Sequence, residues 1–165
     1  MENNQQSPKT YFRMLGIIHL GLVLGVLLFG LVVTFLIADF QRPNIQSGFA
    51  DLFVYLVPGF VMIGIIANNV VFRIKLNAIN ESADIKTKMA VYRESSIIRY
   101  MLIQTPAQIA LCAIIVTNNI NFLVYAGLMV VLLIIKRPTL RLAISDLNLN
   151  QQEKSILENQ DSTIL

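Results

Sequence analysis

Polar side chains inside apolar stretches are the candidates for chemistry in this chain. Gln104, Gln108 and Cys112 follow one another at intervals of four residues, with Thr105 beside them, so they share one face of a helix. Pro106 interrupts the same helix, where its missing N–H leaves the carbonyl four residues earlier unpaired and bends the backbone. This combination of a kink and amide side chains predicts either a small polar cavity or a site of helix contact.

The two glutamines and Thr105 belong to a candidate intramembrane polar layer. It comprises His19, Asn68, Asn69, Arg99, Gln104, Thr105 and Gln108. One interpretation is a polar pocket lined by His19, Asn68, Gln104 and Gln108, since polar groups in hydrocarbon are costly and often functional. The other is a set of interhelical hydrogen bonds that hold a bundle together, and we favour it. Arg99 points away from the glutamines and is close enough to the membrane surface to extend its guanidinium there.

Catalysis and metal binding have few candidate residues. His19 is the only histidine, and no carboxylate lies within an apolar stretch. A metal site would therefore lack ligands, a proton path would lack acids, and a catalytic triad would lack its orienting group. The chain also has no glycine-rich phosphate loop, HExxH or CxxC motif. We expect a protein that is not an enzyme and has no catalytic residues, cofactor or metal.

A pair of glycines in the first apolar stretch indicates close helix packing. Gly21 and Gly25 form a GxxxG motif. Small residues at this spacing allow two membrane helices to approach closely. The motif predicts a packing face, either within the bundle or between subunits.

Four apolar stretches position these residues, and we predict membrane spans at 14–38, 52–72, 97–117 and 120–135. A bilayer core of about 30 Å needs about 20 helical residues. The fourth stretch is shorter, but Lys136 and Arg137 at its end can reach the headgroups. The expected fold is all-α, a polytopic membrane protein with four transmembrane helices arranged as two hairpins.

The charges predict the orientation of these spans. Of the 13 Lys and Arg residues, only Arg42 falls in a segment that we place outside the cell. Because positively charged loops stay in the cytoplasm, both termini are expected there, with residues 1–13 forming a cytoplasmic segment. The protein is predicted to be a multi-pass protein of a bacterial cytoplasmic (inner) membrane, with the lipid bilayer as its first partner.

Two further helical elements are expected on the cytoplasmic side. Ser82 is a candidate N-cap for a helix that continues into the third span, which would give the bundle a short cytoplasmic helical extension. After Pro138, apolar residues at helical spacing predict an interfacial amphipathic helix at 139–147. Residues 148–165 are rich in Asn, Gln, Ser and acidic residues and are expected to form a flexible cytoplasmic tail.

The composition supports this plan. The 165 residues are 55% hydrophobic with a mean hydropathy of +0.64, which fits one membrane domain at 14–138 without a separate soluble domain. The net charge of +3 comes from the cytoplasmic segments, so it indicates orientation and argues against nucleic-acid binding. With one cysteine, Cys112, the chain has no internal disulfide.

The run from Tyr92 to Ala107, YRESSIIRYMLIQTPA, resembles a stretch in a family of small four-span membrane proteins of Bacteroidota-type bacteria. That family has no assigned activity, and its members carry Glu-Gly where this chain has Gln104-Thr105. This departure weakens any proton-coupled role that a buried Glu would support. The layout alone is similar to ATP synthase protein I, an assembly helper. Rotary-ATPase proteolipids also share the layout, but they need an intramembrane carboxylate that this chain lacks.

Two functions follow from these observations. The first is a non-enzymatic assembly, accessory or structural subunit that associates with itself as a homo-oligomer or joins a larger membrane complex. The second is a small channel or transporter with a polar path near Gln104 and Gln108.

Overall fold

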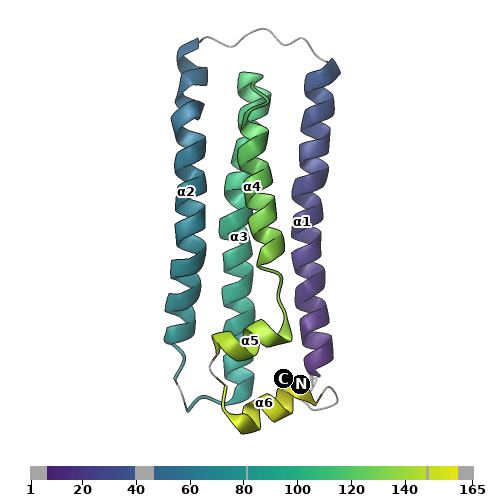
Figure 1. Ribbon diagram of the computed structural model, residues 1–165, viewed down its shortest axis with the longest axis vertical. Coiled ribbons are helices and arrows are strands. Elements are labelled where there is room, and N and C mark those ends of the chain that lie inside the picture. Colours follow the sequence, from purple (N-terminus) through teal and green to yellow (C-terminus); the bar gives the residue numbers. More distant parts are fainter. Residues whose placement is uncertain (1–6, 40–46, 81, 148, 160–165) are drawn as a thin grey trace, which may run out of the picture.

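A computed structural model describes residues 7–39, 47–80, 82–147 and 149–159 of the chain. The described residues form six helices and no strand: α1 (Pro8–Asp39), α2 (Ser47–Asn77), α3 (Ile85–Thr117), α4 (Phe122–Ile135), α5 (Leu140–Asp146) and α6 (Gln151–Glu158). The first four run alternately up and down, and α5 and α6 lie across one end of the bundle (Figure 1). We call this end the α5 end.

Three helices, α1, α2 and α3, are long and apolar enough to cross a membrane. The pair of α4 and α5 is also apolar enough, but a bend of 84° separates the two helices. The described chain therefore has three or four helices that are long and apolar enough to span a membrane, and four is the upper count. The long helices continue past the predicted spans, since α2 reaches Asn77 and α3 begins at Ile85.

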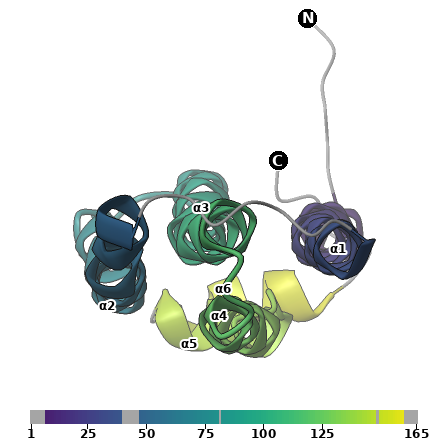
Figure 2. The ribbon, with the colours of Figure 1, turned by 90° about the horizontal axis from the view of Figure 1, so that it is seen from above.

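The central helix of the bundle is α3. It packs against α2, α4 and α1, and Figure 2 shows α1 and α2 on opposite sides of it. In the described chain, α1 packs on α3 and α4 rather than on α2, which is its neighbour in sequence. The expected pairing of the first two spans into a hairpin is therefore wrong, because α3 separates them.

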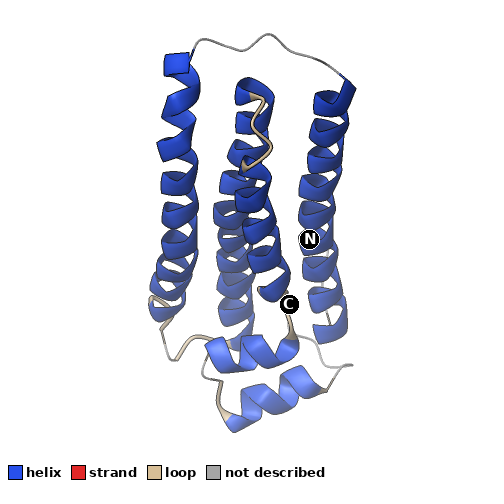
Figure 3. Cartoon of the chain, turned by 45° about the horizontal axis from the view of Figure 1, so that its top comes forward, coloured by secondary structure: helices blue, strands red, loops and turns tan. Residues whose placement is uncertain are grey.

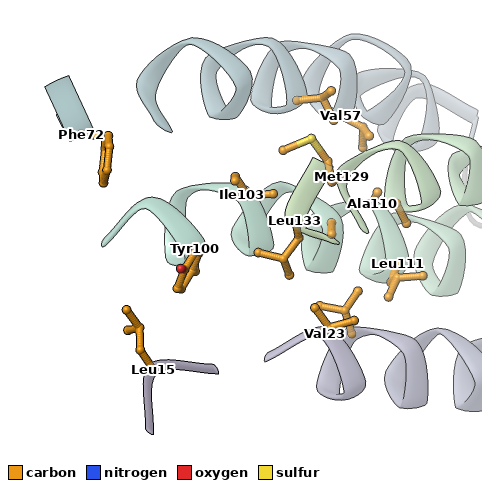
Figure 4. Close-up of a cluster of buried hydrophobic side chains, with 14 of the residues drawn as sticks. Leu15, Val23, Val57, Phe72, Tyr100, Ile103, Ala110, Leu111, Met129 and Leu133 are labelled. Carbon is orange, nitrogen blue, oxygen red and sulfur yellow. The ribbon is translucent and has the colours of Figure 1, made fainter. Parts of the chain in front are cut away.

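The core lies between α3, α4 and the flanking helices. Figure 4 shows Ile103 and Leu111 of α3 and Met129 of α4 among side chains of α1 and α2, and all three are 1% exposed or less. The outward faces of α1, α2 and α4 carry exposed Leu, Ile, Val and Phe side chains, for example Leu28 and Phe35. A surface of this kind suits contact with lipid.

Local signals explain where the helices end. Asn118 closes α3 in the left-handed conformation, with φ of 55°, which asparagine tolerates better than most residues. At the other end of α3, the carboxylate of Asp84 accepts a hydrogen bond from the Thr87 N–H at 3.3 Å. The N-cap is thus Asp84 rather than the expected Ser82, because a carboxylate one residue before the helix can reach the free N–H groups.

The segment after α4 is more ordered than the sequence indicated. Helix α5 lies within the range predicted for an interfacial helix and is capped by Thr139. Residues 148–165 were expected to be flexible, but Gln151–Glu158 form α6, which has a capping box between Asn150 and Glu153. Figure 3 shows α5 and α6 side by side beneath the bundle. Asn148 and residues 160–165 lie outside the described residues, as does Arg42.

Candidate functional site

The predicted polar residues do not line a common cavity. His19 of α1 forms a hydrogen bond to the end of α4, whereas Asn68 forms its hydrogen bonds within its own helix. Gln104 is half-buried and Gln108 is exposed on the surface of α3. The cavities described below include neither glutamine. In the described chain the glutamine stripe therefore faces outward and does not enclose a path.

His19 has a structural contact that accounts for its burial. Its Nε2 atom lies 2.8 Å from the backbone oxygen of Leu133. A carbonyl only accepts, so Nε2 carries the proton and donates. Leu133 lies in the last turn of α4, where a carbonyl group lacks the usual helical hydrogen bond from the N–H four residues later. The ring also packs edge-on against Tyr100 at 4.9 Å between centroids. His19 thus ties α1 to the end of α4 and to the middle of α3.

Helices α2 and α3 come closest at Gly64. A Cβ atom there would lie 2.7 Å from Cγ of Pro106 and 2.9 Å from the Leu102 oxygen. The Leu102 carbonyl has no helical partner, because Pro106, four residues later, lacks an N–H. Pro106 was predicted from the sequence and Gly64 was not, although a glycine in a membrane helix is itself a signal of close approach.

The two glycines that were predicted to pack, Gly21 and Gly25, do not contact another helix of the described chain closely. Gly21 and Gly25 are exposed, and a Cβ atom at either position would meet nothing within 4 Å. Within the described chain the GxxxG motif is not an internal contact. It lies on an outward face, which is where a contact between subunits would use it.

Two asparagines of α2 illustrate how the polar layer is divided. Asn68 is fully buried and its Nδ2 donates to the carbonyls of Gly64 at 2.9 Å and Ile65 at 2.6 Å, while its Oδ1 has no partner among the described residues. Asn69 is exposed, and its Oδ1 lies 3.4 Å from Nη2 of Arg99. Of the predicted polar layer, only Asn69 and Arg99 come together at one site.

That site is a cavity of about 590 Å³ where α2, α3, α4 and α5 meet at the α5 end. We call it the basic cavity. Its charged lining residues are Arg73 of α2, Arg99 of α3, Lys136 after α4 and Asp146 of α5. Three cations and one carboxylate leave an excess of two positive charges. Among the described residues, none of these four groups has an ion-pair partner within 4.0 Å.

Arg99 is held in place within the basic cavity. Its guanidinium lies 4.0 Å from the centroid of the Phe72 ring, a distance typical of a cation–π contact. Phe72 in turn packs against Tyr92 at 6.0 Å between centroids. From the sequence, Lys136 was expected only to reach the headgroups, and Arg73 was one of the basic residues that predicted the orientation. Arg99, a lone charge near the start of a predicted span, was the signal for this site.

A second, smaller cavity of about 420 Å³ adjoins the first and is lined in part by Asp146, Lys88 and Glu153. Here Nζ of Lys88 lies 2.6 Å from Oε1 of Glu153, and both side chains are largely buried. Burial opposes ionisation of Glu153, but the Lys88 hydrogen bond and charge together with the Asn150 N–H lower its pKa below the ordinary value. This ion pair fastens α6 to α3.

A metal centre is not supported by the part of the chain that the structure describes. No three His, Cys, Asp or Glu side chains there gather closely enough to hold a metal ion. Comparison of the chain with protein-family models, with curated proteins and with solved structures finds no match. The geometry of the described residues is therefore the basis for the proposed function.

Proposed function

We propose that the protein is a non-enzymatic subunit of a membrane assembly and that its first partner is a second copy of itself. The observation that carries the proposal is the outward position of Gln108 on α3. Gln108, Thr105 and Cys112 are exposed on α3, the helix that lies between the flanking helices α1 and α2 (Figure 2). An amide facing lipid is costly unless it finds a hydrogen-bond partner. A neighbouring membrane helix supplies one.

A second copy suits this face because an amide side chain both donates and accepts. Two glutamines from identical helices satisfy each other across a two-fold axis, where the same surface meets itself. The hydroxyl of Thr105 donates to the Met101 carbonyl at 2.9 Å, and Gln104 is half-buried, so Gln108 is the more exposed amide of the stripe. The exposed Gly21 and Gly25 on α1 offer a second place where helices can approach closely.

The proposal includes the expected setting: a bacterial cytoplasmic membrane, four spans and both chain ends in the cytoplasm. The charge distribution supports it, because every described Lys and Arg lies in the half of the bundle toward the α5 end. Cytoplasmic loops carry such an excess of basic residues. The fourth span would be α4 with Lys136 and Arg137 reaching the headgroups.

Cys112 is a built-in reporter for the proposed contact. It is the chain's one cysteine, it is exposed, and it follows Gln108 by one helical turn. A disulfide requires two Cα atoms within about 7 Å. Mild oxidation of native membranes is expected to give a linked dimer of two 18.5 kDa chains, and Cys112→Ser should give none.

Matched variants make this test decisive. Gln108→Leu should reduce the linked dimer several-fold, whereas Gln108→Asn keeps the amide and should retain most of it. Thr105→Cys in the Cys112→Ser background tests the same face two helical turns from position 112. Absence of any linked dimer for both cysteines, or equal yields for Gln108→Leu and the unchanged chain, would overturn the proposal. Native mass spectrometry after mild-detergent purification would show instead whether a different protein occupies this face.

A small channel or transporter is the second candidate function. Gln104, Thr105 and Gln108 on facing copies would line a polar path at the interface, which a single chain does not enclose. Flux of ions or small solutes in liposomes tests this idea. If Gln104→Leu combined with Gln108→Leu leaves any measured flux unchanged, the stripe is not a pathway.

A further inference from the structure

The basic cavity has the charge of an anion site. Arg73, Arg99 and Lys136 converge on it from three different elements, with Asp146 as the one carboxylate of its lining. Since no ion pair within 4.0 Å neutralises the three cations in the described chain, their excess charge is available to a ligand. An anion of two charges would balance it.

The presentation of Arg99 makes the site more specific than a patch of charge. The Phe72 ring supports the face of the Arg99 guanidinium at 4.0 Å. Among the described residues, the one side-chain acceptor close to this guanidinium is Oδ1 of Asn69 at 3.4 Å, which is longer than a good hydrogen bond. Nε of Arg99 is buried and has no acceptor among the described residues. A planar guanidinium held in this way matches the oxygens of a phosphate group.

The surroundings indicate where such a phosphate would come from. The apolar surface of α4 ends beside the cavity at Ile135, which is 66% exposed, and Leu142 of α5 is 42% exposed at its rim. A basic pocket at the boundary between apolar and charged surface is the setting in which lipid headgroups bind between membrane helices. The volume of about 590 Å³ accommodates a phosphodiester headgroup.

We infer that the basic cavity binds a phosphate group, held by Arg73, Arg99 and Lys136. An anionic phospholipid headgroup at the membrane surface and a soluble phosphate share this chemistry. The inference is independent of self-association, because the cavity and the outward face of Gln108 share no residue.

The test titrates the purified full chain in neutral detergent with phosphatidylglycerol, and separately with phosphatidylcholine of the same acyl chains, by native mass spectrometry. Retained phosphatidylglycerol is expected, with Lys136→Gln weakening binding about tenfold, the loss expected for one charge-assisted hydrogen bond. Arg137→Gln is the matched control. Arg137 is adjacent in sequence but lines a different cavity, next to α1.

The outcomes separate the two sources of phosphate. If millimolar inorganic phosphate displaces the lipid, the site recognises phosphate alone. If it does not, the site requires the lipid. Equal weakening by Lys136→Gln and Arg137→Gln would mean that general surface charge attracts the lipid. Both lipids carry a phosphodiester and differ in net charge, so their equal retention would mean that the cavity does not select an anionic headgroup. Either result overturns the inference. Arg73→Gln, at an exposed position, provides a second variant that should fold normally.

Discussion

Gly64 of α2 lies directly against Pro106 of α3, and this contact sets how closely the two helices approach. A Cβ atom at position 64 would come within 2.7 Å of Cγ of Pro106, 2.9 Å of the Leu102 oxygen and 3.2 Å of Cε of Met129. Proline frees the Leu102 carbonyl, and glycine allows the backbone of α2 to cover it. The two residues that weaken helices individually therefore form one packed crossing.

Gly64→Ala is expected to destabilise the protein by about 1–3 kcal/mol, the range for overpacking a filled site. The methyl group would meet backbone and a proline ring, which are less able to move than a flexible side chain. Thermal unfolding in detergent measures the change. Gly59→Ala is the control in the same helix, because a Cβ atom there meets nothing within 4 Å. It should be neutral or slightly stabilising, and equal losses for both variants would contradict the proposed crossing.

His19→Ala is expected to cost about 0.5–1.5 kcal/mol, because the Leu133 carbonyl would lose the imidazole donor and keep only the Lys136 N–H at 3.2 Å. His19→Gln retains an N–H donor and should recover part of the loss. The same unfolding measurement compares the two. An unchanged stability in His19→Ala would show that the Lys136 N–H alone satisfies the Leu133 carbonyl. Any measurable catalytic activity that disappears only in this variant would contradict a non-enzymatic role.

Much of this architecture was accessible from the sequence, and the failures have physical causes. Apolar length predicted helices that span a membrane, because the bilayer imposes that length on every chain. Which helices pack together was not predictable, since α1 and α2 are equally apolar toward lipid and toward neighbours. The glutamine stripe of α3 was identified from periodicity, but periodicity does not tell an inward face from an outward one. Arg73 and Lys136 were read as orientation signals, and only the fold brings them to Arg99.

Helix α6 was missed for a related reason. Its sequence is polar and its attachment depends on Lys88, which is 65 residues away in the chain. The capping box of Asn150 and Glu153 was visible as a local pattern, yet a two-turn helix is not stable without tertiary contacts. The buried Leu157 and the Lys88–Glu153 pair supply those contacts.

The attachment of α6 should depend on pH. The pKa of Glu153 is lowered on folding, so its contribution to stability is present above its ordinary pKa of 4.5 and is lost as the pH falls through the lower folded value. Hydrogen exchange of α6 backbone amides is expected to accelerate beyond the intrinsic trend as the pH falls below 4.5. Glu153→Gln should detach α6 already at neutral pH, because the amide oxygen can still accept from Lys88 but leaves its buried charge without a counter-ion. Glu158→Gln, at an exposed position of the same helix, should not.

Asp146→Asn tests the electrostatics of the basic cavity by removing a negative charge, whereas Lys136→Gln and Arg73→Gln remove positive ones. Burial raises the pKa of Asp146 above its ordinary 3.8, although Arg99, Lys136 and Arg73 oppose the shift. A raised folded pKa means that the folded state favours the protonated acid, and this contribution to stability is lost as the pH rises through that pKa. At neutral pH the ionised carboxylate is therefore a net cost to folding, and the neutral amide should leave stability unchanged or slightly higher.

The same change removes the cavity's one negative charge, so phosphatidylglycerol should bind several-fold more tightly by native mass spectrometry. Weaker lipid binding in Asp146→Asn would show that the carboxylate positions the cations rather than competing with the phosphate.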